Sequence, residues 1–243
     1  MVWRCLWAAA LFVLPVILTA QELQSPIKLS SDVPYVLNRD GALLSFAAAS
    51  AQPLATSTAT TTTLVTSWST PPLYVSLDNG AATHAAIQCH FHRPSEHWLN
   101  GRQYPFELHI VLANPANHSH VTAVVAVLFD VDHVPHPFLA QLWPHLKYGH
   151  DPRHGSLHVD LSSLRLHAQS LFLRYVGSLT TAPFTEGIEW IIHHQVQSMS
   201  LAQWTEYTAV FPLPNARPLQ PRYDRQVQLI GPRNYVMDRT VTK

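Results

Sequence analysis

Short apolar runs separated by turn residues dominate the chain, and several of them alternate between apolar and polar positions. This period-two pattern is typical of β-strands that are buried on one face. A run that is apolar at almost every position instead predicts a strand buried on both faces, and residues 121–129 form such a run. Pro, Gly or Asn bounds the predicted strands, which comprise residues 73–77, 86–92, 106–112, 121–129, 171–176 and 188–196.

Three further segments complete the predicted secondary structure. Residues 48–70 are rich in Ala, Ser and Thr, and their β-branched content predicts a solvent-facing strand. Short helices are predicted over residues 137–147 and 200–207, with Ser200 as the N-cap of the second helix. The chain is therefore predicted to be mostly β with peripheral short helices.

Composition limits the possible classes of protein without identifying one. A length of 243 residues suits a single domain, because all-β domains of this size need not split. The formal net charge is zero and only 12% of the residues are charged, so no basic surface favours nucleic acid. We therefore expect no nucleic-acid partner, and the charge is uninformative about a substrate.

The first 20 residues have the features of a secretory signal peptide. Arg4 precedes an apolar run over residues 6–20, and polar residues follow that run. The run is shorter than the roughly 20 residues needed to span a bilayer and contains Pro15, so a membrane anchor is less favoured. We therefore expect residues 1–20 to be a signal peptide, residues 21–243 to be the mature domain, and the protein to be secreted or otherwise exported.

Three histidines are spaced so that a β-hairpin would bring them together. His90 and His92 lie two residues apart on a predicted strand and share one face. Asn100-Gly101 favours a tight turn, after which an antiparallel strand would return His109 to this pair. Three imidazoles suit zinc and leave its fourth position open, as in catalytic zinc sites. The spacing predicts a zinc site, and the alternative is a chance grouping among sixteen histidines.

Two polar neighbours on the same strands are candidates to orient these histidines. A metal-bound imidazole usually donates its second N–H to a carboxylate, carbonyl or amide. Glu107 shares a face with His109, and Gln88 shares a face with His90. Cys89 projects away from this face, which favours a small buried hydrophobe over a metal ligand.

Four motifs occur in an order that matches one known family. The segment from Gln88 to His109 contains the histidines and a short loop before Ser95-Glu96-His97. The other motifs are Gln24-Ser25-Pro26-Ile27, the segment from Tyr175 to Pro183, and the segment from Asn215 to Pro221. Together these segments resemble the α-class carbonic anhydrases, in their secreted, short-loop form. The resemblance implies a single domain with a large twisted, mainly antiparallel sheet and zinc in a conical cleft.

The resemblance also implies an enzyme with Zn²⁺ as its cofactor. The family catalyses the reversible hydration of carbon dioxide to bicarbonate and a proton, by attack of zinc-bound hydroxide. The matching zinc ligands are His90, His92 and His109. The positions of Glu96 and Thr180 match the catalytic pair in which the carboxylate accepts a hydrogen bond from the threonine hydroxyl, so that the hydroxyl oxygen orients the nucleophile. Inhibition by sulfonamides and anions is implied as well.

An apolar holding site for carbon dioxide is implied beside the metal. The matching positions are Val111, Val124, Leu179, Thr181, Ile188 and Trp190. The apolar residues among them could instead belong to ordinary core packing, which is the commoner fate of apolar residues in strands. Outside this set, Asn215 matches a position near a metal ligand.

The chain departs from the family pattern at the proton-shuttle histidine and around the first motif. A threonine run replaces that histidine, with Thr63 nearest to the expected position, and threonine does not titrate near neutrality. We therefore expect a weak or absent shuttle and buffer-dependent turnover, unless His84 or another histidine takes over. The segment ahead of Gln24 is short, and Phe184 stands where many relatives have a cysteine. No intramolecular disulfide is expected once Cys5 leaves with the signal peptide.

Two other functions and one modification remain open. The main alternative is a non-catalytic or weakly active carbonic-anhydrase-like binding module, although such modules typically lose a zinc histidine. A zinc hydrolase acting on esters would use the same nucleophile. Asn117-His118-Ser119 matches the N-glycosylation pattern, so Asn117 is a candidate acceptor if the protein is exported.

Overall fold

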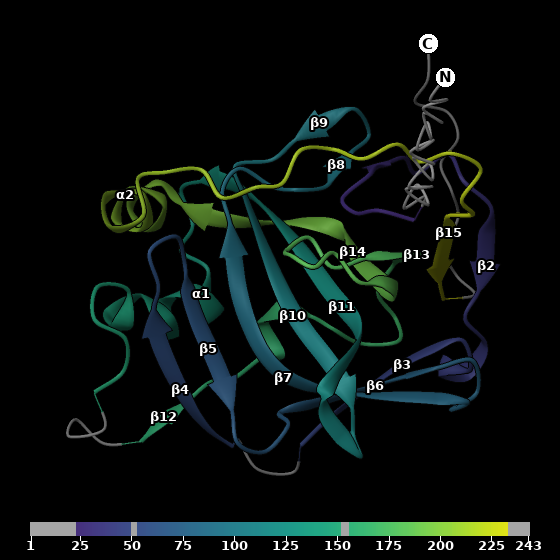
Figure 1. Cartoon of the computed structure of the whole chain (residues 1–243), viewed down its shortest axis with the longest axis horizontal. Helices are drawn as coiled ribbons and strands as arrows, with labels where there is room; N and C mark the ends of the chain where they lie inside the picture. The colour runs from purple at the N-terminus through teal and green to yellow at the C-terminus, as the bar shows by residue number, and fades with distance from the viewer. Residues whose placement is uncertain (1–22, 50–52, 152–155, 233–243) are drawn as a thin grey trace, which may run out of the picture.

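One large β-sheet organises the computed structural model, which describes residues 23–49, 53–151 and 156–232 (Figure 1). The expected signal peptide, with Cys5, lies outside the described residues. Within those ranges the sheet has 12 strands. They are β2 (Tyr35–Leu37), β3 (Leu44–Ala48), β4 (Leu54–Ala59), β5 (Leu64–Trp68), β6 (Leu73–Leu77), β7 (Ala82–His92), β10 (Phe106–Asn114), β11 (Asn117–Asp132), β12 (Leu157–His158), β13 (Phe172–Ser178), β14 (Glu186–Ser200) and β15 (Gln228–Gly231).

The sheet is mixed, although antiparallel pairs predominate. The strands follow the order β12-β4-β5-β7-β10-β11-β14-β13-β15-β2, while β6 pairs with both β7 and β3. The pairs β11–β14 and β15–β2 are parallel, and the other neighbours in the sheet are antiparallel. The expectation of a mostly β fold with a mainly antiparallel sheet is confirmed, with these two parallel pairs added.

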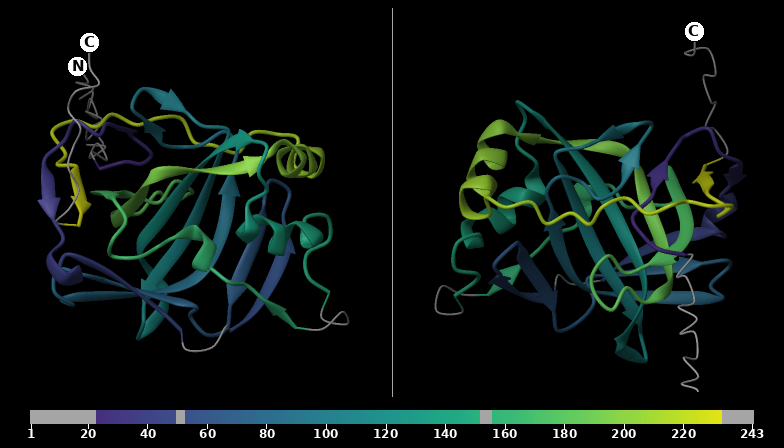
Figure 2. Two further views of the ribbon diagram at one scale, coloured as in Figure 1. Left: turned by 180° about the vertical axis from the view of Figure 1, so that it is seen from behind. Right: turned by 45° about the horizontal axis from the view of Figure 1, so that its top comes forward.

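Small elements surround the sheet. Both α-helices lie toward its β4–β5 side rather than its β2–β15 side (Figures 1 and 2). A separate three-stranded sheet forms near the candidate site, in the order β1-β8-β9. These elements are β1 (Lys28–Leu29), β8 (Trp98–Leu99), β9 (Arg102–Gln103), α1 (Pro137–Leu142), α2 (Leu201–Val210) and the 3₁₀ turns η1 (Arg39–Gly41), η2 (Trp143–His145) and η4 (Ser162–Leu164).

The predicted strand over residues 48–70 is wrong, because the segment forms the hairpin of β4 and β5. The Thr60 hydroxyl accepts hydrogen bonds from the backbone N–H groups of Thr62 and Thr63 and donates to the Thr63 carbonyl. These local bonds stabilise a turn inside the threonine run. Alternate residues of β4, including Ser57, are buried, so the hairpin is not simply solvent-facing.

The helix predictions are confirmed in position. Ser200 caps α2 through a reciprocal capping box with Gln203, as the sequence suggested for its N-cap. The first helix is shorter than predicted, because α1 ends at Leu142 and continues as η2. Pro144 lies within η2, and proline cannot donate the backbone hydrogen bond that would extend an α-helix.

Two apolar cores pack on opposite faces of the central strands. The first core contains Phe91 from β7 and Phe106 from β10. The second core contains Val124 from β11 and Trp190 from β14. Residues 123–129 of β11 are all buried and alternate between the two cores. The prediction that this strand is buried on both faces is therefore confirmed.

Candidate metal centre

Antiparallel pairing of β7 with β10 brings the three histidines together. His109 is directly opposite His90, and Glu107 is opposite His92. The Asn100-Gly101 turn does not join these strands directly, since it connects the short strands β8 and β9. Both turn residues have positive φ, 51° and 80°, as a tight hairpin turn requires.

The histidine rings surround one point. Their centroids are 5.0 Å apart for His90 and His92, 5.4 Å for His90 and His109, and 4.4 Å for His92 and His109. Each ring offers one nitrogen, and these three atoms lie within 4.8 Å of one another. We call these three residues the histidine site.

Hydrogen bonds to the outer ring nitrogens fix the orientation of two of these rings. The His90 Nδ1 atom lies 3.1 Å from Oε1 of Gln88, as the shared strand face predicted. The His92 Nδ1 atom lies 3.3 Å from the backbone carbonyl of Asn215. This leaves Nε2 of each ring directed away from these partners, and Nε2 of His92 is buried without a hydrogen-bond partner. A buried, unpartnered imidazole nitrogen is what a metal ligand requires before the metal binds.

Glu107 orients the third histidine and is fully buried. Its Oε1 atom lies 2.8 Å from Nε2 of His109, which leaves Nδ1 of His109 for a metal. The same Oε1 lies 2.7 Å from Nδ1 of His97, while Oε2 accepts the backbone N–H groups of Glu96 and His97. Burial alone would raise the pKa of Glu107, but the charges and hydrogen bonds of His97 and His109 hold it well below its usual range.

A chain of side-chain hydrogen bonds continues from Glu107 to the first motif. His97 Nε2 lies 2.7 Å from the Tyr175 hydroxyl, which in turn lies 2.9 Å from the Ser25 hydroxyl. A Cβ atom at Gly177 would collide with the Ser25 hydroxyl, so only glycine fits beside these hydrogen-bonded side chains. Three of the sequence motifs contain these residues, but no local pattern indicates their roles, because their partners lie up to 150 residues away.

Burial keeps the three imidazoles neutral. It lowers the pKa of His92 to about 4, although the Glu107 charge opposes this shift. Burial and the neighbouring histidines hold the pKa of His90 well below its ordinary value and also lower that of His109. A metal ligand must be a neutral imidazole. The residues present therefore fit a zinc ion in donor type, number and protonation.

Glu96 lies beside this site and is held by the C-terminal segment. Its Oε1 atom accepts the backbone N–H of Arg217 at 2.8 Å and lies 3.3 Å from Nδ1 of His92. Burial raises the pKa of Glu96, while His109, Arg217 and the Thr180 side chain lower it in part. Its Oε2 atom is buried and accepts no well-aligned hydrogen bond from any described residue. The Thr180 side chain therefore lies close enough to Glu96 to affect its pKa, and the Oε2 atom of Glu96 remains available as a hydrogen-bond acceptor.

Asn215 ties the C-terminal segment to the end of β7. Its Oδ1 accepts the backbone N–H of Arg93 at 2.8 Å, and its Nδ2 donates to the Phe91 carbonyl at 2.8 Å. This segment runs from α2 across the end of the sheet towards β15 (Figures 1 and 2). It therefore delivers both the Asn215 carbonyl and the Arg217 N–H to residues more than 120 positions earlier.

The expected apolar wall lies next to His109. Val111 shares its face and pairs across the sheet with Val124, which in turn pairs with Trp190. The Trp190 ring lies 4.9 Å from the His109 ring. Ile188 packs with these residues in the second core, and Leu179 packs against it. Thr181, the remaining member of the predicted set, is exposed at the surface.

Neither Thr63, nearest to the expected shuttle position, nor His84, the candidate replacement, has its side chain directed to the histidine site. Thr63 is buried, and its hydroxyl oxygen accepts hydrogen bonds from the Phe91 N–H and the Tyr207 hydroxyl. His84 shares a face of β7 with Ala86, which belongs to the first core, and its Nδ1 contacts the Thr122 hydroxyl at 2.7 Å. The register of β7 shifts between Gln88 and Ala86, so this face is opposite to the face of His90.

Fold and site together define a β-sheet protein with a buried three-histidine centre suited to a metal ion. Residues 16–230 match the sequence model described as "Eukaryotic-type carbonic anhydrase". The chain belongs to this family. Within the described residues, no helix combines the length and apolar character needed to cross a membrane.

Individual relatives agree with this assignment. "Alpha carbonic anhydrase 4" of Arabidopsis thaliana is 34% identical over 149 residues, covering 60% of this chain and 54% of the relative. "Dioscorin dioA3" of Dioscorea japonica is 34% identical over 147 residues, covering 57% and 51%. The chain thus spans about half the length of the curated relatives it matches. The α-carbonic anhydrase of Thermovibrio ammonificans, solved with the inhibitor sulfanilamide, superposes with a TM-score of 0.71 at 29% identity, covering 85% of this chain and 87% of that one.

Proposed function

We propose that this protein is a zinc-dependent carbonic anhydrase, which converts carbon dioxide and water reversibly into bicarbonate and a proton. The observation that carries the proposal is the histidine site, in which three neutral imidazoles direct unengaged nitrogens at one point. Family membership supports the same reaction, because the matched relative from Arabidopsis thaliana is named a carbonic anhydrase.

His90, His92 and His109 would hold the zinc ion. When bound, zinc supplies a hydroxide nucleophile at neutral pH, because it lowers the pKa of coordinated water to about 7. Gln88, Glu107 and the Asn215 carbonyl keep the outer ring nitrogens engaged. They thereby fix which nitrogen of each ring faces the metal.

Glu96 and Thr180 would orient the nucleophile. The Oε2 atom of Glu96 has no partner among the described residues, so it would be available to accept a hydrogen bond from the Thr180 hydroxyl. The threonine oxygen would then be left to accept a hydrogen bond from the attacking group. This arrangement requires rigid neighbours, and the buried bond from Arg217 to Glu96 supplies one constraint. The role of the pair is positional, since neither side chain exchanges a proton with the substrate.

Carbon dioxide would be held against the wall next to His109. The molecule is small and apolar, and Val111, Val124, Leu179, Ile188 and Trp190 offer an apolar surface there. Thr181, which is exposed, would lie at the outer end of this site. Inhibition by sulfonamides and anions is part of the proposal, supported by the sulfanilamide complex of the Thermovibrio ammonificans enzyme.

Proton release is expected to be slow in this chain. The Thr63 hydroxyl is occupied by two donors, and His84 belongs to the opposite face of β7. Neither group can pass a proton from the histidine site to bulk water. We therefore propose that external buffer carries the proton away.

Export and glycosylation complete the proposal. Residues 1–20 are proposed as a cleaved signal peptide, and residues 21–243 as the catalytic domain. Asn117 is exposed, and its Oδ1 accepts hydrogen bonds from the N–H and the hydroxyl of Ser119 at 3.1 and 2.6 Å. This geometry leaves the amide nitrogen accessible as a glycan acceptor.

The decisive experiment measures zinc content together with carbon dioxide hydration in the purified mature protein. One equivalent of zinc and chelator-sensitive hydration are expected, and His92→Ala should lose both. Gln226→Ala, a substitution outside the site, is the matched control. Bound zinc without hydration would instead favour the alternative of a non-catalytic or weakly active binding module. Absence of zinc would overturn the ligand assignment, and ester hydrolysis in excess of hydration would indicate a zinc esterase.

A further inference from the structure

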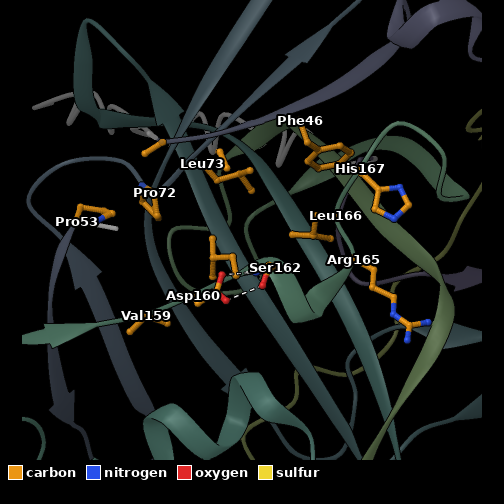
Figure 3. Close-up of a pocket in the computed structure, with 13 residues that line it drawn as sticks. Phe46, Pro53, Pro72, Leu73, Val159, Asp160, Ser162, Arg165, Leu166 and His167 are labelled. Carbon is orange, nitrogen blue, oxygen red and sulfur yellow. Dashed lines mark hydrogen bonds between the residues drawn. The ribbon is translucent and has the colours of Figure 1, made fainter. Parts of the chain in front are cut away.

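A cavity of about 400 Å³ lies away from the histidine site, between the end of β3, the start of β6 and the segment around η4 (Figure 3). Phe46 and Leu166, which line it, pack against the first core. That core lies on the face of β7 opposite to His90, so the cavity belongs to the other side of the sheet. Its volume is within the usual range for small-molecule pockets.

The cavity has apolar walls and a cationic end. Apolar side chains, among them Phe46, Leu73 and Leu166, form much of its lining. Arg165 and His167 lie together at one end, as Figure 3 shows, while Leu73 lies nearer the other. A pocket with mostly apolar walls and a few polar groups at one end selects a ligand that is itself apolar with one polar group.

Arg165 is the unusual residue of this lining. Among the described residues, none forms an ion pair with its guanidinium or accepts a hydrogen bond from it. Two further hollows meet at the same residue, one lined by His193 and Gln195 and another by His136. Its backbone has φ 54°, in the left-handed region where glycine is favoured. Arg165 therefore occupies a costly backbone position at the edge of the cavity, where its side chain is exposed to solvent and its planar donor fork has no partner among the described residues.

Asp160 lines the same cavity but is already hydrogen-bonded. Its Oδ1 accepts the Ser162 N–H at 2.8 Å, and its Oδ2 accepts the Ser162 hydroxyl at 2.6 Å. These bonds lower the pKa of Asp160, which therefore stays negatively charged. Asp160 and Arg165 both line the cavity, but only Arg165 lacks a described partner for its charge. The charged group that is left to bind a ligand is therefore the guanidinium, which would pair with an anion.

We infer that this cavity binds a small organic carboxylate with an apolar tail, the carboxylate pairing with the Arg165 fork and the tail packing against Phe46, Leu73 and Leu166. A planar carboxylate matches two parallel N–H donors of one guanidinium, whereas the apolar walls exclude a bare inorganic anion from most of the volume. The site is independent of the histidine site, from which the sheet separates it.

The test is a titration of the protein with 3-(4-fluorophenyl)propanoate, followed by ¹⁹F NMR. A roughly millimolar dissociation constant is expected for a ligand of this size. Arg165→Gly should weaken binding about tenfold, through loss of the charge-assisted pair. Glycine adopts the backbone conformation at this position without strain, so the variant should fold. Arg165→Lys should retain part of the affinity, because the charge remains while the planar fork is lost.

Two further variants and one probe separate this site from alternatives. Leu166→Trp should weaken binding by filling the cavity, and Asp160→Asn should strengthen it by removing a repulsive charge. The amine 2-(4-fluorophenyl)ethylamine should bind more weakly than the carboxylate. His92→Ala should leave carboxylate binding unchanged, so a failed carbonic anhydrase assignment would not affect this result.

Four outcomes would overturn the inference. They are no binding of the carboxylate at about 10 mM, equal affinity in Arg165→Gly, equal affinity for the amine, and loss of binding in His92→Ala. The last result would place the carboxylate in the histidine site instead.

Discussion

The two faces of β7 and β10 show how one pair of strands builds two different environments. On one face, His90 and His92 from β7 meet His109 from β10. On the other face, one residue away along the chain, Phe91 stacks on Phe106 with ring centroids 5.1 Å apart. Over this part of the two strands, the period of two assigns neighbouring residues in sequence to opposite faces.

The faces also differ in how their side chains are satisfied. The aromatic face is packed by residues from distant segments, with Phe91 meeting Trp143 at 5.6 Å and Tyr207 at 6.0 Å. The histidine face instead leaves polar atoms unpartnered, among them Nε2 of His92 and Oε2 of Glu96. We therefore expect the apolar face to contribute more to the stability of the fold than the histidine face, whose unpartnered polar atoms are left for binding.

The largest expected effect is on stability at the aromatic face. Phe91→Ala should lower the free energy of unfolding by about 3–5 kcal/mol, because it opens a cavity among fully buried rings. His92→Ala in zinc-free protein should cost clearly less. Urea denaturation of both variants, with the metal removed, measures the difference. Equal losses would show that the two faces do not divide stability and chemistry in this way.

A second prediction concerns metal affinity at the histidine face. Glu107→Gln should weaken zinc binding about 10–100-fold, because the amide cannot accept from both His97 and His109 and also from two backbone N–H groups. Competition with a chromophoric chelator measures the affinity. Glu206→Gln, on the exposed side of α2, is the control and should bind zinc normally. Unchanged affinity in Glu107→Gln would remove Glu107 from the site.

The third prediction concerns how the free energy of unfolding depends on pH, through histidines on the first-core side of the sheet. His84, His136 and His193 are buried there, and burial lowers the pKa of each below 6.5. The unfolded chain then binds more protons than the folded protein at acidic pH. Stability is therefore present above about pH 6.5 and falls below it, by up to about 1.4 kcal/mol per pH unit for each histidine. In zinc-free protein the histidine site adds to this slope, since burial also lowers the pKa of its three histidines. The first-core contribution is therefore measured by comparing unfolding of the parent and of His193→Gln between pH 7 and 5, and the variant should show a shallower slope.

The smallest expected effect concerns proton release. Thr63 and His84 are not directed to the histidine face, so turnover should depend on external buffer. Raising the imidazole concentration at constant pH should therefore raise turnover several-fold. Stopped-flow hydration measures this rescue, and His84→Ala should behave like the parent protein. Fast turnover at low buffer would mean that another group on the histidine face transfers the proton.

Local sequence patterns predicted the parts of the fold that depend on near neighbours. The period of two placed His90 with His92 and Glu107 with His109, and the Ser200 cap and the buried run of β11 followed from short-range patterns. The threonine run misled the prediction because its hydroxyls stabilise a turn rather than one long strand. A turn of that kind carries no Gly or Pro signal.

The sequence by itself determined most of the strand pattern, the three candidate ligand residues and the family, since these follow from spacing and ordered motifs. Only the tertiary structure decided what surrounds them. The Asn215 carbonyl, the Arg217 N–H and the chain from His97 through Tyr175 to Ser25 reach the site from segments far away in sequence. The same is true of the cavity at Arg165. Such contacts depend on how the sheet twists and closes, and no local pattern records which distant segments it brings together.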